Sequence, residues 1–168
     1  MAASLVIRLT GGIGNITPNV SLGGLMSDAA LNTNITMYNL FRLITNAQRA
    51  TGCTLYRAVD IYNLGPDTAT AVSMWFSSNT QSTRTELRIG KEAVSNPHHV
   101  SDNLQTIADE FTPPSSPVIT FSAAATASRL TMCNLAISHA NRIWFRLVVN
   151  PAAYATSIDS VNISLACT

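Results

Sequence analysis

The sequence predicts an all-β fold, an antiparallel β-sandwich of the jelly-roll or Ig-like kind with about eight short strands. The first observation is the segment 55–79, in which two runs alternate apolar and polar residues on either side of the turn 63–67, Asn-Leu-Gly-Pro-Asp. The second is that further alternating runs follow, most of them bounded by turn residues. Two packed antiparallel sheets fit this pattern better than alternating strands and helices.

Each predicted strand has an aliphatic face and a more polar or aromatic face. The two runs in 55–79 are interpreted as a hairpin. The predicted strands are 4–9, 55–62, 71–76, 85–89, 118–122, 130–137, 142–150 and 158–167. A short helix is expected over 37–50, where apolar residues recur at helical spacing before Gly52, and a single helical turn near 104–108.

The 168 residues are expected to form a single domain, with 10–36 as an extended arm or long loop. This segment is rich in Asn, Thr, Ser and Gly, so it cannot build a core alone.

Charge and hydropathy argue against several classes of partner. Only 11% of residues are charged and the formal net charge is +1, so no strong field exists to gather nucleic acid or anionic lipid. No apolar run reaches the roughly 20 residues of a membrane span, and no signal peptide is evident. We therefore expect no nucleic-acid partner, no membrane and synthesis without secretion.

Basic charge comes from nine arginines and one lysine, Lys91. Arginine is enriched and lysine depleted at protein interfaces, so this bias favours a surface partly covered by neighbours. Codon or family bias explains it equally well.

No cofactor or metal site is predicted. Cys53, Cys133 and Cys167 lack the paired short spacings of zinc ligands and are expected to be reduced thiols in the core.

Three patterns invite a catalytic or phosphate-binding interpretation, and each has a simpler one. His98 or His99 with Asp102 would suit a general base and its orienting carboxylate, but the histidine doublet falls in a predicted loop. The glycine run 11–14 follows a strand without leading into a helix, so a turn is favoured over a phosphate loop. The acidic pair 109–110 is expected to be solvated. We expect no enzymatic activity.

Four aromatic residues alternate with polar ones on predicted strands: Tyr56, Tyr62, Trp75 and Trp144. They could stack on sugars, but core or inter-subunit packing is the favoured interpretation.

The chain resembles a group of small virion proteins of tailed bacteriophages. The similarity rests on short motifs: SLGG at 21–24, MS at 26–27, NLF at 39–41, YR at 56–57, YN at 62–63, SSNT at 77–80, TELRIG at 85–90, IADE at 107–110, VITFS at 118–122 and IWFR at 143–146. It implies a non-enzymatic structural component of the virion, assembled in the host bacterial cytoplasm.

Within that class, we expect a capsid cement or decoration protein whose arm reaches across neighbouring subunits. The alternatives are a tail or baseplate-associated structural protein and a glycan-binding host-adhesion module. The expected partners are the major capsid protein or other virion subunits and further copies of the chain, for example in a trimer. The candidate interface residues are Leu22, Leu25, Arg42, Arg49, Tyr62, Trp75 and Trp144.

Overall fold

The computed structural model describes residues 3–32, 39–79, 83–93, 96–151 and 160–168. Within these ranges the protein is an all-β sandwich of two antiparallel sheets, which confirms the predicted fold class. The larger sheet has the order β2-β1-β3-β8-β5, with β6 paired to β8: β1 (Leu5–Thr10), β2 (Met26–Ala30), β3 (Cys53–Asn63), β5 (Thr85–Lys91), β6 (His98–His99) and β8 (His139–Val149). The smaller sheet has the order β7-β4-β9: β4 (Ser73–Asn79), β7 (Leu130–Thr131) and β9 (Val161–Ala166).

The centre of the larger sheet is the pair β3 and β8, each 11 residues long. They run antiparallel in unbroken register from Cys53 opposite Val149 to Tyr62 opposite Ala140. Both strands are rich in the β-branched and aromatic residues that fit a pleated surface. Their inward side chains meet the smaller sheet in the main core, which includes Val59, Ile143 and Met74.

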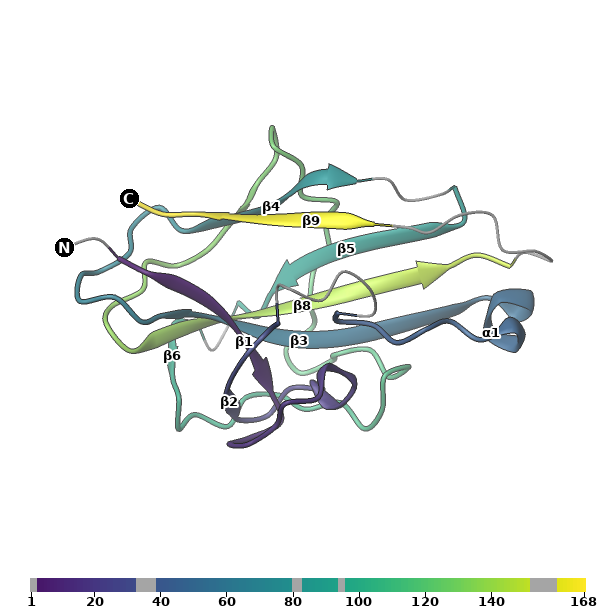
Figure 1. The fold of residues 1–168 in the computed structure, drawn as a ribbon, viewed down its shortest axis with the longest axis horizontal. Helices are drawn as coiled ribbons and strands as arrows, with labels where there is room; N and C mark the ends of the chain where they lie inside the picture. The colour runs from purple at the N-terminus through teal and green to yellow at the C-terminus, as the bar shows by residue number, and fades with distance from the viewer. Residues whose placement is uncertain (1–2, 33–38, 80–82, 94–95, 152–159) are drawn as a thin grey trace.

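The segment 55–79 contains two strands, as predicted, but they are not a hairpin. β3 belongs to the larger sheet and β4 to the smaller one, where β4 pairs with β7 and β9 (Figure 1). The buried Asn63 amide holds the crossing turn by donating to the carbonyls of Asp67 and Leu135. The turn therefore carries the chain from one layer to the other.

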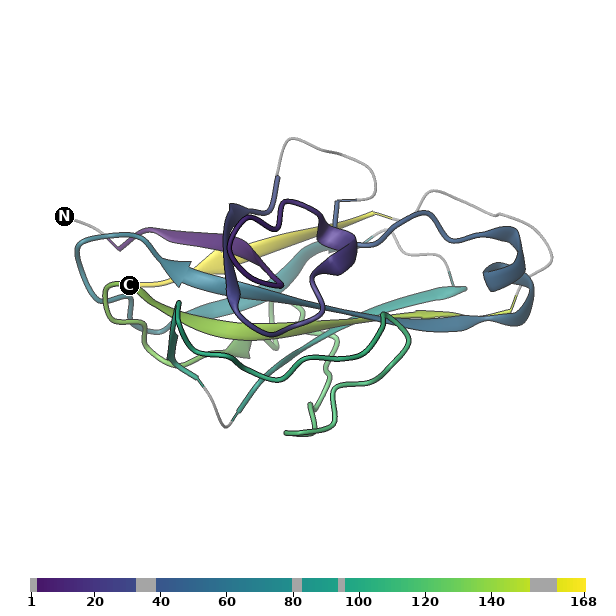
Figure 2. The ribbon, with the colours of Figure 1, turned by 90° about the horizontal axis from the view of Figure 1, so that it is seen from below.

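The outer face of the larger sheet is also covered. Residues 11–25 and 100–121 lie below β3 in Figure 1 and in front of the sheet in Figure 2. A second apolar cluster forms beneath them around Ala58, Trp144 and Ile107. Strands β3 and β8 are thus covered on both faces, and the polar side of β3 that carries Asp60 lies inside the molecule.

The predicted arm folds back on its own domain. Its residues 26–30 form β2, which pairs with β1, and the Ser21 carbonyl accepts the Ala58 N–H. Of the expected extended arm or long loop over 10–36, residues 11–25 form a loop that lies on the domain, residues 26–30 form a strand, and residues 33–36 lie outside the described ranges.

The helix predicted over 37–50 is much shorter. Helix α1 (Asn46–Thr51) begins after Thr45, which forms a capping box with Gln48, while residues 39–45 are irregular and residues 37–38 lie outside the described ranges. Leu40 and Phe41 pack against the main core, which explains the apolar spacing without a helix.

Three other predicted elements are reduced or absent. Residues 104–108 contain no helical turn, and 118–122 contributes only isolated bridges, including one between Ser122 and Ile89. The run 130–137 forms the two-residue β7 and a bridge from Leu135 to Ala69. A short 3₁₀ turn, η1 (Pro18–Val20), was not predicted.

The three cysteines are unpaired and half-buried rather than fully in the core. Burial, reinforced by the Glu110 charge, raises the pKa of the Cys53 thiol, so it remains protonated to higher pH than a free cysteine.

Candidate interaction surface

A buried charge cluster lies on the outer face of the larger sheet. Asp60 on β3 and Arg142 on β8 are directly opposite in register, and both are fully buried. The guanidinium binds the carboxylate through two bonds, Nε to Oδ1 at 2.7 Å and Nη2 to Oδ2 at 3.0 Å. Such a two-bond pair compensates the desolvation of both charges.

This cluster also holds two covering segments against the sheet. Arg142 Nη2 donates to the Gly24 carbonyl at 2.8 Å, which fixes the N-terminal loop, residues 11–25. His98 on β6 places Nε2 3.0 Å from Asp60 Oδ1 and Nδ1 3.0 Å from its neighbour's carbonyl oxygen. Both ring nitrogens thus lie within hydrogen-bond distance of an oxygen atom. Asp60 and Arg142 together thus link the sheet to the loop, through Arg142, and to the strand β6, through Asp60.

The N-terminal loop is shaped by its glycines. The amides of Gly11 and Gly12 both donate to the Leu25 carbonyl, at 2.9 and 3.1 Å, and the Gly14 amide donates to the Asp28 carboxylate. This last bond is the largest cause that lowers the pKa of Asp28. The amides that a phosphate loop would offer to an anion are therefore engaged within the chain, which agrees with the favoured turn.

The loop presents apolar side chains to solvent. Ile13 is 82% exposed, Ile16 79% and Leu25 38%, and Val20 is also exposed. No charged residue occurs between Arg8 and Asp28. Apolar side chains gathered on one ordered loop are a feature of surfaces that meet another protein.

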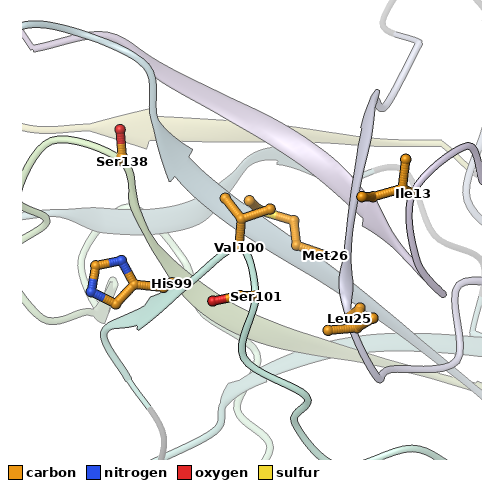
Figure 3. Close-up of a pocket in the computed structure, with 7 residues that line it drawn as sticks. All are labelled: Ile13, Leu25, Met26, His99, Val100, Ser101 and Ser138. Carbon is orange, nitrogen blue, oxygen red and sulfur yellow. The ribbon is translucent and has the colours of Figure 1, made fainter.

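Beside the loop lies an open hollow of about 470 Å³ with mainly apolar walls (Figure 3). It is lined by Ile13, Leu25, Met26, His99, Val100, Ser101 and Ser138. These residues come from the N-terminal loop, β2, β6 with its following turn, and the residue before β8. We call the hollow and the exposed apolar residues of the loop the interaction surface.

A second charged group lies beside the part of β3 that does not pair with β1. Glu110 pairs with the buried Arg57 and with the exposed Arg42, and its carbonyl accepts the Tyr56 N–H at 2.7 Å. The neighbouring carboxylate of Asp109 instead accepts from the Thr112 hydroxyl, the main cause that lowers its pKa. The acidic pair 109–110 is thus divided between an internal ion pair and an exposed turn.

The candidate interface residues do not form one surface. Leu25 belongs to the interaction surface, whereas Leu22 packs into the outer cluster. Arg42 is bound to Glu110, and Arg49 donates to Asn46 on α1. Arg49 lies on α1, which is at the opposite end of the sandwich from β6 (Figure 1), whereas Arg42 precedes that helix in the chain.

Two of the three aromatic candidates pack inside the molecule, in keeping with the packing interpretation favoured over sugar stacking. Trp144 is fully buried and donates its indole N–H to Glu92 at 2.9 Å, and Tyr62 is buried with Arg8 over its ring. Neither can contact a partner or a sugar in this conformation. Trp75 is half-buried on the smaller sheet beneath Arg129, whose guanidinium carbon lies 3.9 Å from the ring centre.

The histidine arrangement also differs from the catalytic interpretation. His98 faces Asp60, while Asp102 accepts the backbone N–H of His99 and not its ring. The His99 ring packs against the tilted ring of His139, with centroids 3.9 Å apart, because the two residues are paired across β6 and β8. The ring and carboxylate that would form a base and its orienter are therefore not brought together.

Sequence reasoning missed the residues that build the surface. Asp60 and Arg142 carry opposite charges on the two long strands, but each strand also holds an arginine, Arg57 or Arg146, so the sequence did not show which charges would pair. Ile13 and Ile16 carried no periodic signal, and the pairing of His99 with His139 depended on the unpredicted strand β6.

No protein-family model, curated protein or solved structure matches the chain. No helix in the described part of the chain has the length and apolar character needed to cross a bilayer. The described ranges also contain no group of three or more His, Cys, Asp or Glu side chains arranged to hold a metal ion.

Proposed function

We propose that the chain is a non-enzymatic structural component of a tailed-phage virion, a capsid cement or decoration protein that binds the shell through the interaction surface. The observation that carries this proposal is the set of exposed apolar side chains on a loop that is fixed to the sheet from beneath. Ile13 and Leu25 are exposed beside an apolar hollow, while Gly24 of the same loop is bonded to buried Arg142.

An ordered apolar surface favours permanent association. Binding through a preformed loop costs less conformational entropy than binding through a chain that orders on contact. The apolar area removed from water supplies the favourable term, about 25 cal/mol per Å². Few charges are required, in keeping with a chain of which 11% of residues are charged.

The resemblance to phage virion proteins supports the particle as the location. It rests on motifs that the fold uses for its own packing, such as 143–146 in β8, where Trp144 and Phe145 are buried. It therefore supports a shared type of domain, and the two experiments below test the partner. The glycan-binding alternative has less support, because Tyr62 and Trp144 are not accessible to a sugar.

The first test images purified particles of the phage that encodes the chain. Mass spectrometry should detect the protein in them, and electron microscopy should place it in symmetric copies over the shell. Density restricted to the tail would overturn the decoration role in favour of a tail-associated protein. Absence from purified particles would overturn the virion function itself.

The second test measures binding of purified protein to shells that lack it. Ile13→Asp/Ile16→Asp should reduce binding at least about tenfold, since each variant side chain places a charge in an apolar contact. The matched control is Leu43→Asp: Leu43 is 62% exposed, precedes α1 in the chain and does not line the hollow. Equal binding by both variants would exclude the interaction surface as the contact.

A further inference from the structure

In the described part of the chain the strand orders of the two sheets end at β2, β5, β7 and β9, and the first three of these strands are protected or short. On β5, Ile89 exchanges two backbone hydrogen bonds with Ser122, at 2.9 and 2.8 Å. The edge strand β7 has two residues, and Lys91 Nζ donates to its Thr131 carbonyl at 2.9 Å. The strand β2 is short and carries the charged Asp28, which binds the N-terminal loop.

The fourth edge belongs to β9. This strand pairs with β4 from Asn79 opposite Val161 to Ser73 opposite Ala166, with one register shift between Phe76 and Ser78 on β4. On its other side, no described residue makes a backbone hydrogen bond to residues 161–166. In an antiparallel strand every second residue directs its N–H and C=O away from a single neighbour, so these donors and acceptors of β9 have no backbone partner among the residues that the structure describes.

The sequence of β9 lacks the usual protection of an edge strand. Residues 160–168, SVNISLACT, contain no charge and no proline. Proteins block free edges with lysine, proline, bulges or very short strands, and an edge without them is a template for pairing with another chain. By comparison, the edge strand β5 carries Glu86, Arg88 and Lys91.

The side chains of β9 suit an identical partner. Val161, Ile163 and Leu165 face the main core, while Asn162 and Ser164 alternate with them and face outward. In a two-fold antiparallel pair, the outward residues of one strand lie beside outward residues of the other, and apolar residues beside apolar ones. No like charges meet, and a closed two-fold contact needs no complementary surface elsewhere.

We propose that β9 pairs antiparallel with β9 of a second copy, so that the smaller sheets of two chains form one continuous sheet. This is β-strand addition with the chain itself as the partner. The resulting assembly is a two-fold dimer, in contrast to the trimer considered from the sequence. The pairing does not depend on the phage proposal, because a monomer or a dimer could equally bind a shell.

The test is analytical ultracentrifugation of the full chain over a range of concentrations. Wild-type protein should sediment at twice the mass of a single chain and dissociate on dilution. Asn162→Lys/Ser164→Lys should raise the dissociation constant about tenfold or more, since lysines on facing edge strands repel. Asn162→Glu/Ser164→Glu should behave in the same way, and an equimolar mixture of the two variants should dimerise again.

The controls separate pairing from folding. Thr126→Lys/Ala127→Lys adds the same charge on an exposed loop and should leave the dimer unchanged. Hydrogen exchange should show concentration-dependent protection of alternate β9 amides in wild-type protein. The proposal is overturned by a wild-type monomer at every concentration, by a trimer, or by a dimer that the lysine variant leaves intact. It is also overturned if mixing two folded variants fails to restore the dimer.

Discussion

Asp60→Asn removes one buried negative charge and leaves the groups that faced it. Arg142 would retain a fully buried positive charge with its bond to the Gly24 carbonyl, which prevents the side chain from swinging into water. His98 would keep its contact at 3.0 Å but lose the charge opposite it. The structure has no other carboxylate bonded to this arginine among the described residues.

The expected loss of stability is large. Breaking a buried ion pair by removing one partner typically costs about 3–5 kcal/mol, because the other charge stays desolvated. Domains are stable by about 5–15 kcal/mol, so the variant would lose a large share of the total. At about 2–4 °C per kcal/mol for a chain of this size, Tm should fall by about 6–20 °C.

Urea unfolding followed by circular dichroism measures this loss. Glu86→Gln is the matched control, since it removes a carboxylate from a pair with Arg88 in which both side chains are over a third exposed, and should cost no more than about 1 kcal/mol. In Asp60→Asn/Arg142→Met the loss should be smaller than the sum of the single losses. If Asp60→Asn costs no more than Glu86→Gln, the cluster does not hold the fold together as argued.

Three further outcomes are expected. Trp144→Phe should lower the free energy of unfolding by about 1–3 kcal/mol in urea, because the Glu92 carboxylate loses its buried donor. Gly23→Ala should increase proteolysis of the N-terminal loop, since its φ is +97° and a Cβ would lie 2.1 Å from the Gln105 oxygen; unchanged cleavage would contradict the close approach. Asp28→Asn should remove part of the acid sensitivity measured in stability curves against pH. The folded-state pKa of Asp28 is lowered, so its contribution is complete above the unfolded-state pKa and is lost as pH falls through the lower folded value. A wild-type curve identical to that of the variant would show that this bond does not contribute.

Alternation was a sound guide to the long strands and a poor guide to what covers them. It correctly located β3, β8 and β9, where apolar and polar residues alternate over several residues. It could not show that the polar side of β3 is buried. A charged side chain on one strand is expected to be exposed to solvent unless an oppositely charged partner on another strand is known. The register that places Asp60 opposite Arg142 depends on pairing between two strands that are far apart in the sequence.

The local misassignments have a similar cause. Leu40 and Phe41 showed helical spacing because both reach the core, although their backbone is irregular. The short strands β2 and β6 exist because β1 and β8 lie beside them, so their own sequences gave no signal. The candidate interface residues included Leu25, which is exposed, but not Ile13, whose exposure depends on the loop fold.

The bond between Arg142 and Gly24 spans 118 residues, and the pair of Arg142 with Asp60 spans 82. During synthesis the N-terminal loop therefore leaves the ribosome long before the side chain that fixes it exists. This loop, which carries the apolar residues, therefore lacks the bond to Arg142 until β8 has emerged, when most of the chain has already left the ribosome. A nascent chain paused before that point should bind hydrophobic-surface chaperones, and release should coincide with the emergence of β8.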